Sequence, residues 1–99
     1  LTMSARELAF RALRLCNLED NLRDAAERAL TRTDELISRA RDLVSEQDSD
    51  QARRALNRAV ELEGEAWTQF RANHPEGSLR LTQSARTFAH RAIRLASAR

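Results

Sequence analysis

Apolar residues recur through the middle of the chain at alternating spacings of four and three positions, the pattern of a helix with one packed face. In the first part of this region the row consists of Leu22, Ala26, Ala29, Thr33, Leu36, Ala40 and Leu43. In the second part it consists of Ala52, Ala55, Ala59, Leu62 and Ala66, broadened by Leu56, Val60, Trp67 and Phe70. The two rows predict helices over residues 19–45 and 48–72, which together form a helical hairpin.

Polar and helix-breaking residues separate these helices. Residues 46–50 are polar, and Asp48 is placed to cap the second helix, with Gln51 three positions later completing a capping box. Residues 73–78 predict a loop, because Asn73 tolerates a left-handed backbone and Pro75 cannot continue the preceding helix. A last helix over residues 76–98 follows. Its apolar row is Leu81, Ala85, Phe88, Ala92 and Leu95.

The last helix is a second copy of the N-terminal segment. Residues 1–15 read LTMSARELAFRALRL and residues 81–95 read LTQSARTFAHRAIRL, with ten of fifteen positions identical at an offset of 80. The matches stay in one register without gaps, so a true internal repeat explains them better than shared composition does. The chain is therefore expected to be one helical domain over residues 1–99, in which the hairpin of residues 19–72 lies between two copies of one helix.

The course of residues 1–18 has two interpretations. Asn17 could cap a new helix, which would make residues 16–19 a break. The apolar phase, however, runs through this segment from Leu1 to Ala29 without Gly or Pro, and favours one long helix over residues 2–45. The expected fold class is all-α, an antiparallel three-helix bundle. Its N-terminal segment either extends the first hairpin helix or folds back as a fourth helix.

The extended version is similar to the spectrin-repeat plan, in which the third helix of one three-helix unit continues as the first helix of the next. The similarity is one of arrangement only, because the period here is shorter and Trp67 lies on the middle helix. It implies that residues 1–18 and 76–98 connect neighbouring units. In that arrangement nothing within the chain covers Leu1, Leu8 and Leu15, which we predict to form an interface with a partner copy.

Composition agrees with a helical structure. Two Gly, one Pro and four aromatic residues among 99 indicate few turns and a thin core rich in Ala. No apolar run reaches the ~20 residues of a membrane span, and no signal peptide is visible. All seventeen basic residues are Arg, which suggests a bacterial source. Because the first residue is Leu rather than Met, we expect further sequence upstream, and the compartment is left open, a secreted parent included.

Residues that could carry catalysis or bind a metal are scattered. Most of the fifteen Asp and Glu alternate with Arg, as on a solvated helix face with weak ion pairs. His74 and His90 are sixteen positions apart and belong to no metal-binding motif, and His90 aligns with Phe10 in the other copy. The lone Cys16 aligns with Ala96, which indicates a packing role. We therefore expect no catalytic residue, no cofactor and no metal site.

Charge is distributed unevenly along the chain. The formal charge is +2 over residues 1–16 (three Arg, one Glu) and −5 over residues 17–70 (eight Arg, thirteen acids). Over residues 71–99 it is +5 (six Arg, one Glu). On the last helix Arg80, Arg91 and Arg94 project within a narrow sector. These three side chains are a candidate site for an anionic partner, either nucleic acid or acidic lipid.

A second interpretation of the charges needs no outside partner. Basic helices can pack beside acidic hairpins, within the chain or between copies. The near-neutral total, the absence of Lys and the lack of interleaved aromatic residues favour this interpretation. The expected function is a non-enzymatic scaffold or self-association module, a repeat unit of a larger bacterial protein. Binding of an anionic partner is the alternative.

Overall fold

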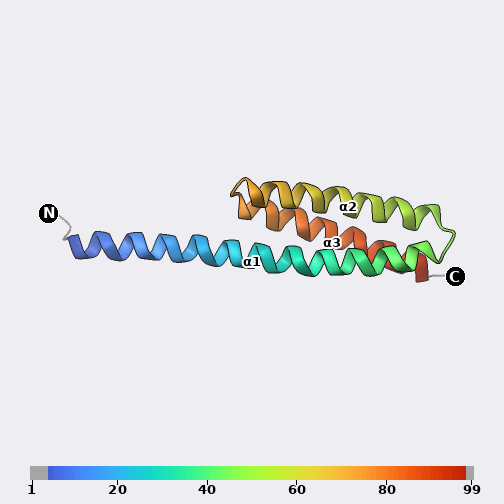
Figure 1. The fold of residues 1–99 in the computed structure, drawn as a ribbon, viewed down its shortest axis with the longest axis horizontal. Helices are drawn as coiled ribbons and strands as arrows, with labels where there is room; N and C mark the ends of the chain where they lie inside the picture. The colour runs from blue at the N-terminus through green and yellow to red at the C-terminus, as the bar shows by residue number, and fades with distance from the viewer. Residues whose placement is uncertain (1–4, 98–99) are drawn as a thin grey trace.

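Three helices follow one another along the chain in the computed structural model, which describes the backbone of residues 5–97 and the side chains of residues 20–97. Helix α1 spans Ala5–Ser45, α2 spans Asp50–Arg71 and α3 spans Pro75–Ser97. Figure 1 shows α2 returning alongside α1, with α3 running back beside both of them. The described backbone contains no strand. The predicted all-α helical bundle is confirmed.

Two predictions fall on the N-terminal segment. One concerns whether residues 1–18 extend the first helix of the bundle or pack back against it, and the other the interface at Leu1, Leu8 and Leu15. The described backbone of α1 is one helix from Ala5 to Ser45. How residues 1–18 pack, and whether Leu1, Leu8 and Leu15 form an interface, depend on side chains outside the described residues, so both stay predictions.

The start of α2 is set by Ser49. This residue has an extended backbone (φ −129°, ψ 112°), and its hydroxyl oxygen accepts the backbone N–H of Ala52 at 3.2 Å. The prediction that Asp48 caps the helix is wrong, because Asp48 lies one residue before the position from which a side chain reaches that N–H. Asp48 instead pairs with Arg53, with 3.5 Å between the charged atoms.

The turn between α2 and α3 has Asn73 and Pro75 in their predicted roles, but it is shorter than the predicted loop of residues 73–78, because α3 begins at Pro75. Asn73 has a φ of 65°, and the next residue, His74, donates its backbone N–H to the carbonyl of Gln69 at 2.9 Å. Pro75 then begins α3, at a position where a helix needs no backbone donor. Arg23 of α1 donates to the side-chain oxygen of Asn73 at 3.1 Å and so ties α1 to this turn.

Replacing Asn73 by Val should lower the free energy of unfolding by roughly 1–2 kcal/mol, because a β-branched residue fits the left-handed region poorly. Asn73→Gly is the matched control. It keeps the backbone conformation and loses only the exposed bond to Arg23. Urea unfolding of both variants measures the difference. Equal costs for Val and Gly would show that the left-handed backbone is not what Asn73 supplies.

The buried rows of α1 and α3 share every second member with the predicted apolar rows, and their other members lie one position further along the chain. On α1 the buried residues are Ala26, Leu30, Thr33, Ile37, Ala40 and Val44. On α3 they are Ser78, Thr82, Ala85, Ala89, Ala92 and Ala96, which we call the α3 seam. The larger predicted members, such as Leu36 and Phe88, are half-buried at the margins. Small side chains on the facing line allow a close approach of the helix axes, and the margins have room for large ones.

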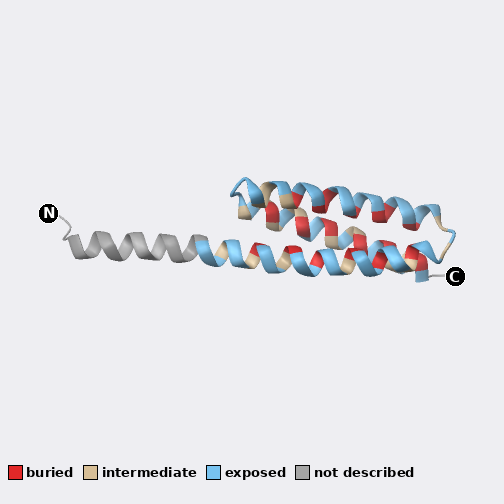
Figure 2. Ribbon diagram, viewed as in Figure 1, coloured by how far each residue is buried: buried red, intermediate tan, exposed pale blue. Residues whose placement is uncertain are grey.

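The predicted small-residue stripe of α2 is confirmed. Its buried residues are Ala52, Ala55, Leu56, Ala59, Leu62, Glu63 and Ala66. Figure 2 shows the buried positions of all three helices on the sides that face one another. Beside the turn to α3, the rings of Trp67 and Phe70 meet edge to face with centroids 5.7 Å apart, and the Arg23 guanidinium lies 5.1 Å from the centroid of the Phe70 ring. These aromatic side chains close one end of the bundle.

Candidate functional site

A polar layer crosses the core of the bundle, with one side chain from each helix. Thr33 of α1, Glu63 of α2 and Thr82 of α3 are 0%, 4% and 0% exposed. The Thr82 hydroxyl oxygen lies 2.7 Å from Oε1 of Glu63 and 2.8 Å from the hydroxyl oxygen of Thr33. We call these three residues the Glu63 layer. Because a buried carboxyl group is costly unless it is hydrogen-bonded, this layer is the most unusual chemistry in the described part of the chain.

The layer is surrounded by further polar groups from all three helices. Asp34 of α1 accepts the indole N–H of Trp67 of α2, with Nε1 at 3.1 Å and 3.3 Å from its two carboxyl oxygens. Arg86 of α3 places Nη2 at 3.5 Å from both the carbonyl oxygen of Ala29 and the hydroxyl oxygen of Thr33. Asp34 and Arg86 are therefore the charged groups that face Glu63 from the two neighbouring helices.

These surroundings keep Glu63 protonated at neutral pH. Burial is the largest cause and the Asp34 carboxyl the second, and on balance the pKa of Glu63 rises from 4.5 to about 8. The hydroxyl of Thr82 and the charge of Arg86 act in the opposite direction and lower the pKa, but by less. A neutral carboxyl group at this position avoids the large cost of a buried charge.

A count of protons in the layer agrees with a protonated Glu63. Three short oxygen–oxygen contacts are present: Glu63 to Thr82, Thr82 to Thr33, and Thr33 to the Ala29 carbonyl at 2.9 Å. Each contact needs one proton, and the two hydroxyl groups supply only two. The carboxyl proton supplies the third, so that Glu63 donates to Thr82, Thr82 to Thr33, and Thr33 to Ala29. The second carboxyl oxygen, Oε2, is buried and meets no donor.

A protonated carboxyl beside a second carboxyl is also an arrangement that acid–base enzymes use. The hollow that Glu63 shares with Asp34 measures about 260 Å³, smaller than the roughly 300–1,000 Å³ of typical ligand pockets. Among residues 20–97, no three His, Cys, Asp or Glu side chains gather where they could hold a metal ion. The layer joins the three helices through one buried carboxyl group and two hydroxyl groups.

The three arginines predicted to bind an anion all lie exposed on α3. Arg80 lines a hollow beside the α2–α3 turn, together with His74 and Glu76. Arg91, eleven residues further on and so about 16 Å along the helix axis, lines a different hollow. Arg94 lies one turn beyond Arg91. The narrow angular sector predicted from the sequence thus spreads these side chains along the helix rather than gathering them around one pocket.

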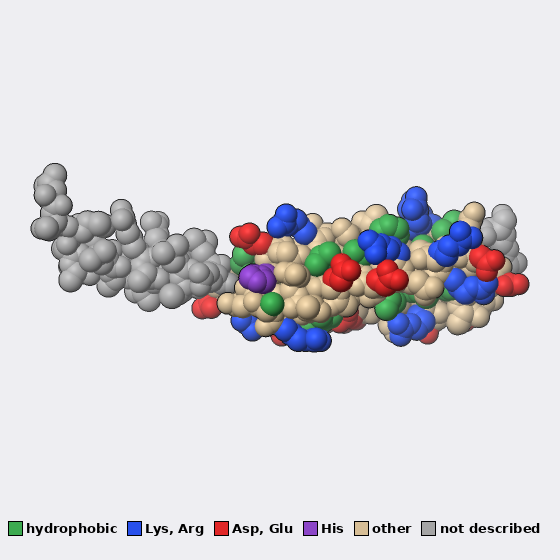
Figure 3. All heavy atoms as spheres, turned by 90° about the horizontal axis from the view of Figure 1, so that it is seen from above, with side chains coloured by type: hydrophobic (Ala, Val, Ile, Leu, Met, Phe, Trp, Pro, Cys, Tyr) green, Lys and Arg blue, Asp and Glu red, His purple; other side chains and the backbone are tan. Residues whose placement is uncertain are grey.

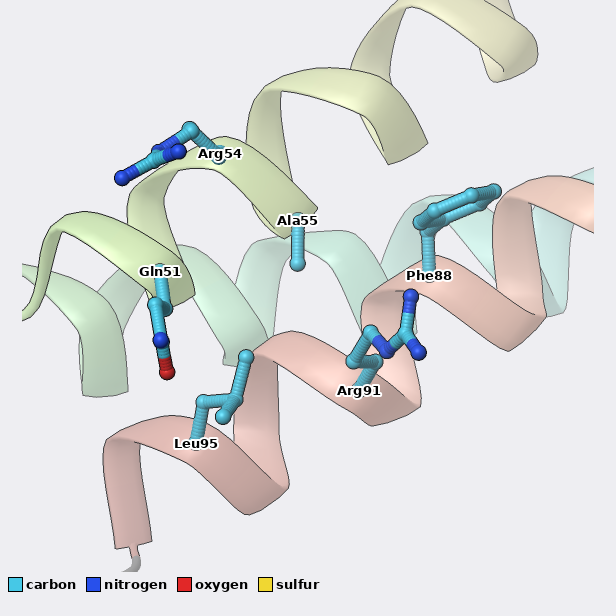
Figure 4. Close-up of a pocket in the computed structure, with 6 residues that line it drawn as sticks. All are labelled: Gln51, Arg54, Ala55, Phe88, Arg91 and Leu95. Atoms are coloured by element: carbon cyan, nitrogen blue, oxygen red, sulfur yellow. The ribbon is translucent and has the colours of Figure 1, made fainter.

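The hollow beside Arg91 lies between α2 and α3 and measures about 430 Å³. Figure 4 shows Arg54 projecting from α2 on one side and Arg91 from α3 on the other, with Ala55 between them and Phe88 and Leu95 along α3. On the face of the molecule drawn in Figure 3, basic and acidic side chains are interspersed, and neither sign forms a continuous patch. That face offers no uniform field to an anionic partner.

The Glu63 layer was not predicted from the sequence, although the position of Glu63 in the apolar row of α2 is a signal for it. Counted in steps of four and three from Ala52, the α2 row passes through Leu56, Ala59, Glu63 and Ala66, which puts Glu63 in phase with the core.

Within the described part of the chain, none of the helices combines the length and apolarity needed to cross a bilayer. Comparison with protein-family models, with curated proteins and with solved structures finds no match to this chain.

Proposed function

We propose that this chain is a non-enzymatic helical scaffold module, a repeat unit of a larger bacterial protein that associates with like units. The observation that carries the proposal is the duplication of the helix that completes the bundle. Helix α3 packs its seam against both other helices, and ten of fifteen residues of its central part recur at the start of the chain. Repeat proteins extend by duplicating such packing elements, each of which contacts its neighbours.

Two further observations support a structural role. Buried polar groups of the core form bonds between helices, as in the contact of Thr82 with both Glu63 and Thr33. The charges also complement one another: the hairpin region of residues 17–70 is acidic by five charges, whereas residues 71–99 are basic by five and residues 1–16 by two. Complementary charge of this kind guides partner choice and orientation more than it adds affinity.

Light scattering and sedimentation equilibrium over a wide range of concentrations test the proposal. We expect the 99-residue chain to self-associate and the double substitution Leu8→Glu/Leu15→Glu to abolish the association, because the charges would lie in an apolar contact. Val60→Glu is the control, since Val60 is an exposed apolar residue on α2. A chain that stays monomeric at every concentration would contradict self-association.

The alternative function is binding of an anionic partner through Arg80, Arg91 and Arg94. The observation in its favour is that two arginines, Arg54 of α2 and Arg91 of α3, line one hollow (Figure 4). Titration with duplex DNA and with anionic vesicles at increasing salt separates the two functions. Tight, salt-dependent binding that is lost when the three arginines of α3 become Gln would favour the alternative over the scaffold.

A further inference from the structure

The contacts of α3 show which residues of its N-terminal copy are equipped for packing. At the offset of 80, the seam residues Thr82, Ala85, Ala89, Ala92 and Ala96 correspond to Thr2, Ala5, Ala9, Ala12 and Cys16. Four of these five pairs are identical, and the fifth exchanges one small residue for another. Arg86, which reaches Ala29 and Thr33 of α1, corresponds to Arg6 and is identical as well.

The differences between the two copies follow exposure on α3. Three of the five differing positions are Gln83, Thr87 and His90, and all three are exposed. The other two are the half-buried Phe88 and Ile93, where the first copy has Leu in both places. The copies thus agree at the four fully buried positions of the repeated stretch, Thr82, Ala85, Ala89 and Ala92.

The register of α1 provides a second, independent observation. Its buried row runs from Val44 back to Ala26 in alternating steps of four and three. Continued toward the N-terminus, the same steps pass through Arg23, Glu19, Cys16, Ala12, Ala9, Ala5 and Thr2. The first two of these positions, Arg23 and Glu19, are charged. The other five are the positions that correspond to the α3 seam. One continuous heptad phase therefore carries two packing rows, with Glu19 and Arg23 marking the boundary between them.

The direction of the helices decides which hairpin the N-terminal copy can join. In the order α1, α2, α3 the chain reverses twice, so α3 runs parallel to α1 (Figure 1). A segment that folded back at Asn17 would run antiparallel to α1 and could not reproduce the packing of α3. Packing like that of α3 therefore requires a hairpin from another unit.

We propose that residues 2–16 bind the α1–α2 hairpin of a second copy of this unit in place of that copy's own α3, in the same position and direction. Thr2 then meets the carboxyl group of Glu63 in that copy, and Arg6 meets the carbonyl of Ala29. The basic segment approaches an acidic hairpin, as the charge distribution favours. The inference rests on the proposed function and gives its partner surface. In a tandem array the same contact joins each unit to the next.

Four forms of the 99-residue chain test this contact. The first is the parent. The second carries Ala85→Glu and Ala92→Glu, which block the α3 seam. The third carries Ala5→Glu and Ala12→Glu, which block the corresponding row of the first copy, and the fourth combines all four substitutions. The control for added charge is Gln83→Glu with His90→Glu, because both residues are exposed on α3.

In the chain with a blocked α3 seam, the hairpin is open to residues 2–16 of another copy. We expect this form to stay helical, to sediment as a dimer or larger species, and to unfold at a midpoint that rises with protein concentration. The chain with all four substitutions should lose its helicity at every concentration. The chain blocked only in the first copy should remain folded and should not associate.

Two results would overturn the contact. One is a form with a blocked α3 seam that is as unfolded as the fourfold variant at every concentration, or that folds as a monomer. The other is association of the chain blocked in the first copy that equals that of the parent. The second result would leave the proposed self-association standing while removing residues 2–16 from it, so the two proposals fail separately.

Discussion

Replacing Glu63 by Gln should abolish a loss of stability that the parent chain undergoes as the pH rises. Burial among α1, α2 and α3, in front of Asp34, raises the pKa of Glu63 in the folded chain from 4.5 to about 8. Between these two values the unfolded chain has released its proton and the folded chain still holds it. The stability that depends on the protonation of Glu63 is therefore at its full value below about pH 4.5. Above that pH the free energy of unfolding falls by about 1.4 kcal/mol per pH unit until about pH 8.

Glutamine at this position is neutral at every pH, has nearly the same shape as a protonated Glu, and can donate an amide N–H to Thr82 where the protonated carboxyl donates its proton. Urea unfolding followed by the fluorescence of Trp67, the lone tryptophan, measures the slope between about pH 4 and pH 9. The control is Glu65→Gln, because Glu65 is exposed two residues further along α2. A parent chain whose stability does not fall with pH, or a Glu63→Gln variant that keeps the slope of the parent, would show that Glu63 is ionised in the folded chain.

Leu30→Ala should be among the most destabilising single truncations in the described part of the chain. Leu30 has the largest of the side chains that are fully buried there, with 0% exposure. Its truncation leaves a cavity between helices that cannot approach one another much further, and costs roughly 2–5 kcal/mol. Domains of this size have about 5–15 kcal/mol in total, so the variant should be close to unfolding in water.

Leu36→Ala is the matched comparison, because the sequence pattern places Leu36 in the packed row and the structure places it half-buried at the margin of α1. We expect its cost to be well below that of Leu30→Ala, as measured by thermal and urea unfolding. The reverse order would mean that α1 faces the core with the row predicted from the sequence and not with the row that contains Leu30 and Ile37.

The helices and the Ser49 and Asn73 turns follow from local sequence, and most of their ends could be predicted to within about two residues. The packed row could be predicted only to within one position. Helices this rich in Ala and Leu have apolar residues in more than one row along the helix. Which row faces the neighbouring helices depends on how closely the helix axes approach one another. On α3 the small residues Ala89 and Ala96 belong to that row, and Phe88 and Leu95 lie beside it.

The candidate site depends on contacts that no local pattern contains. Glu63 lies in the stretch Glu61-Leu62-Glu63-Gly64-Glu65, which resembles a solvated run of acids. Only the phase of the α2 row distinguishes Glu63 from its two acidic neighbours. Its hydroxyl partner Thr82 is 19 positions away in the sequence, and Thr33 is 49 positions from Thr82. A raised pKa at Glu63 requires all three helices in place and cannot be derived from any one of them.

The Glu63 layer also fixes the axial register of α3 against the hairpin. A helix that faces its partners with Ala85, Ala89, Ala92 and Ala96 presents nearly the same surface after a slide of seven residues, so alanine packing alone leaves several registers of similar energy. Sliding α3 by one heptad would put Ala89 or Pro75 where Thr82 now stands, and neither residue has a hydroxyl group for the buried carboxyl of Glu63. One polar layer thus selects a single register from the several that alanine packing allows. If units are joined through such contacts, as proposed, a fixed register would give them a constant axial spacing.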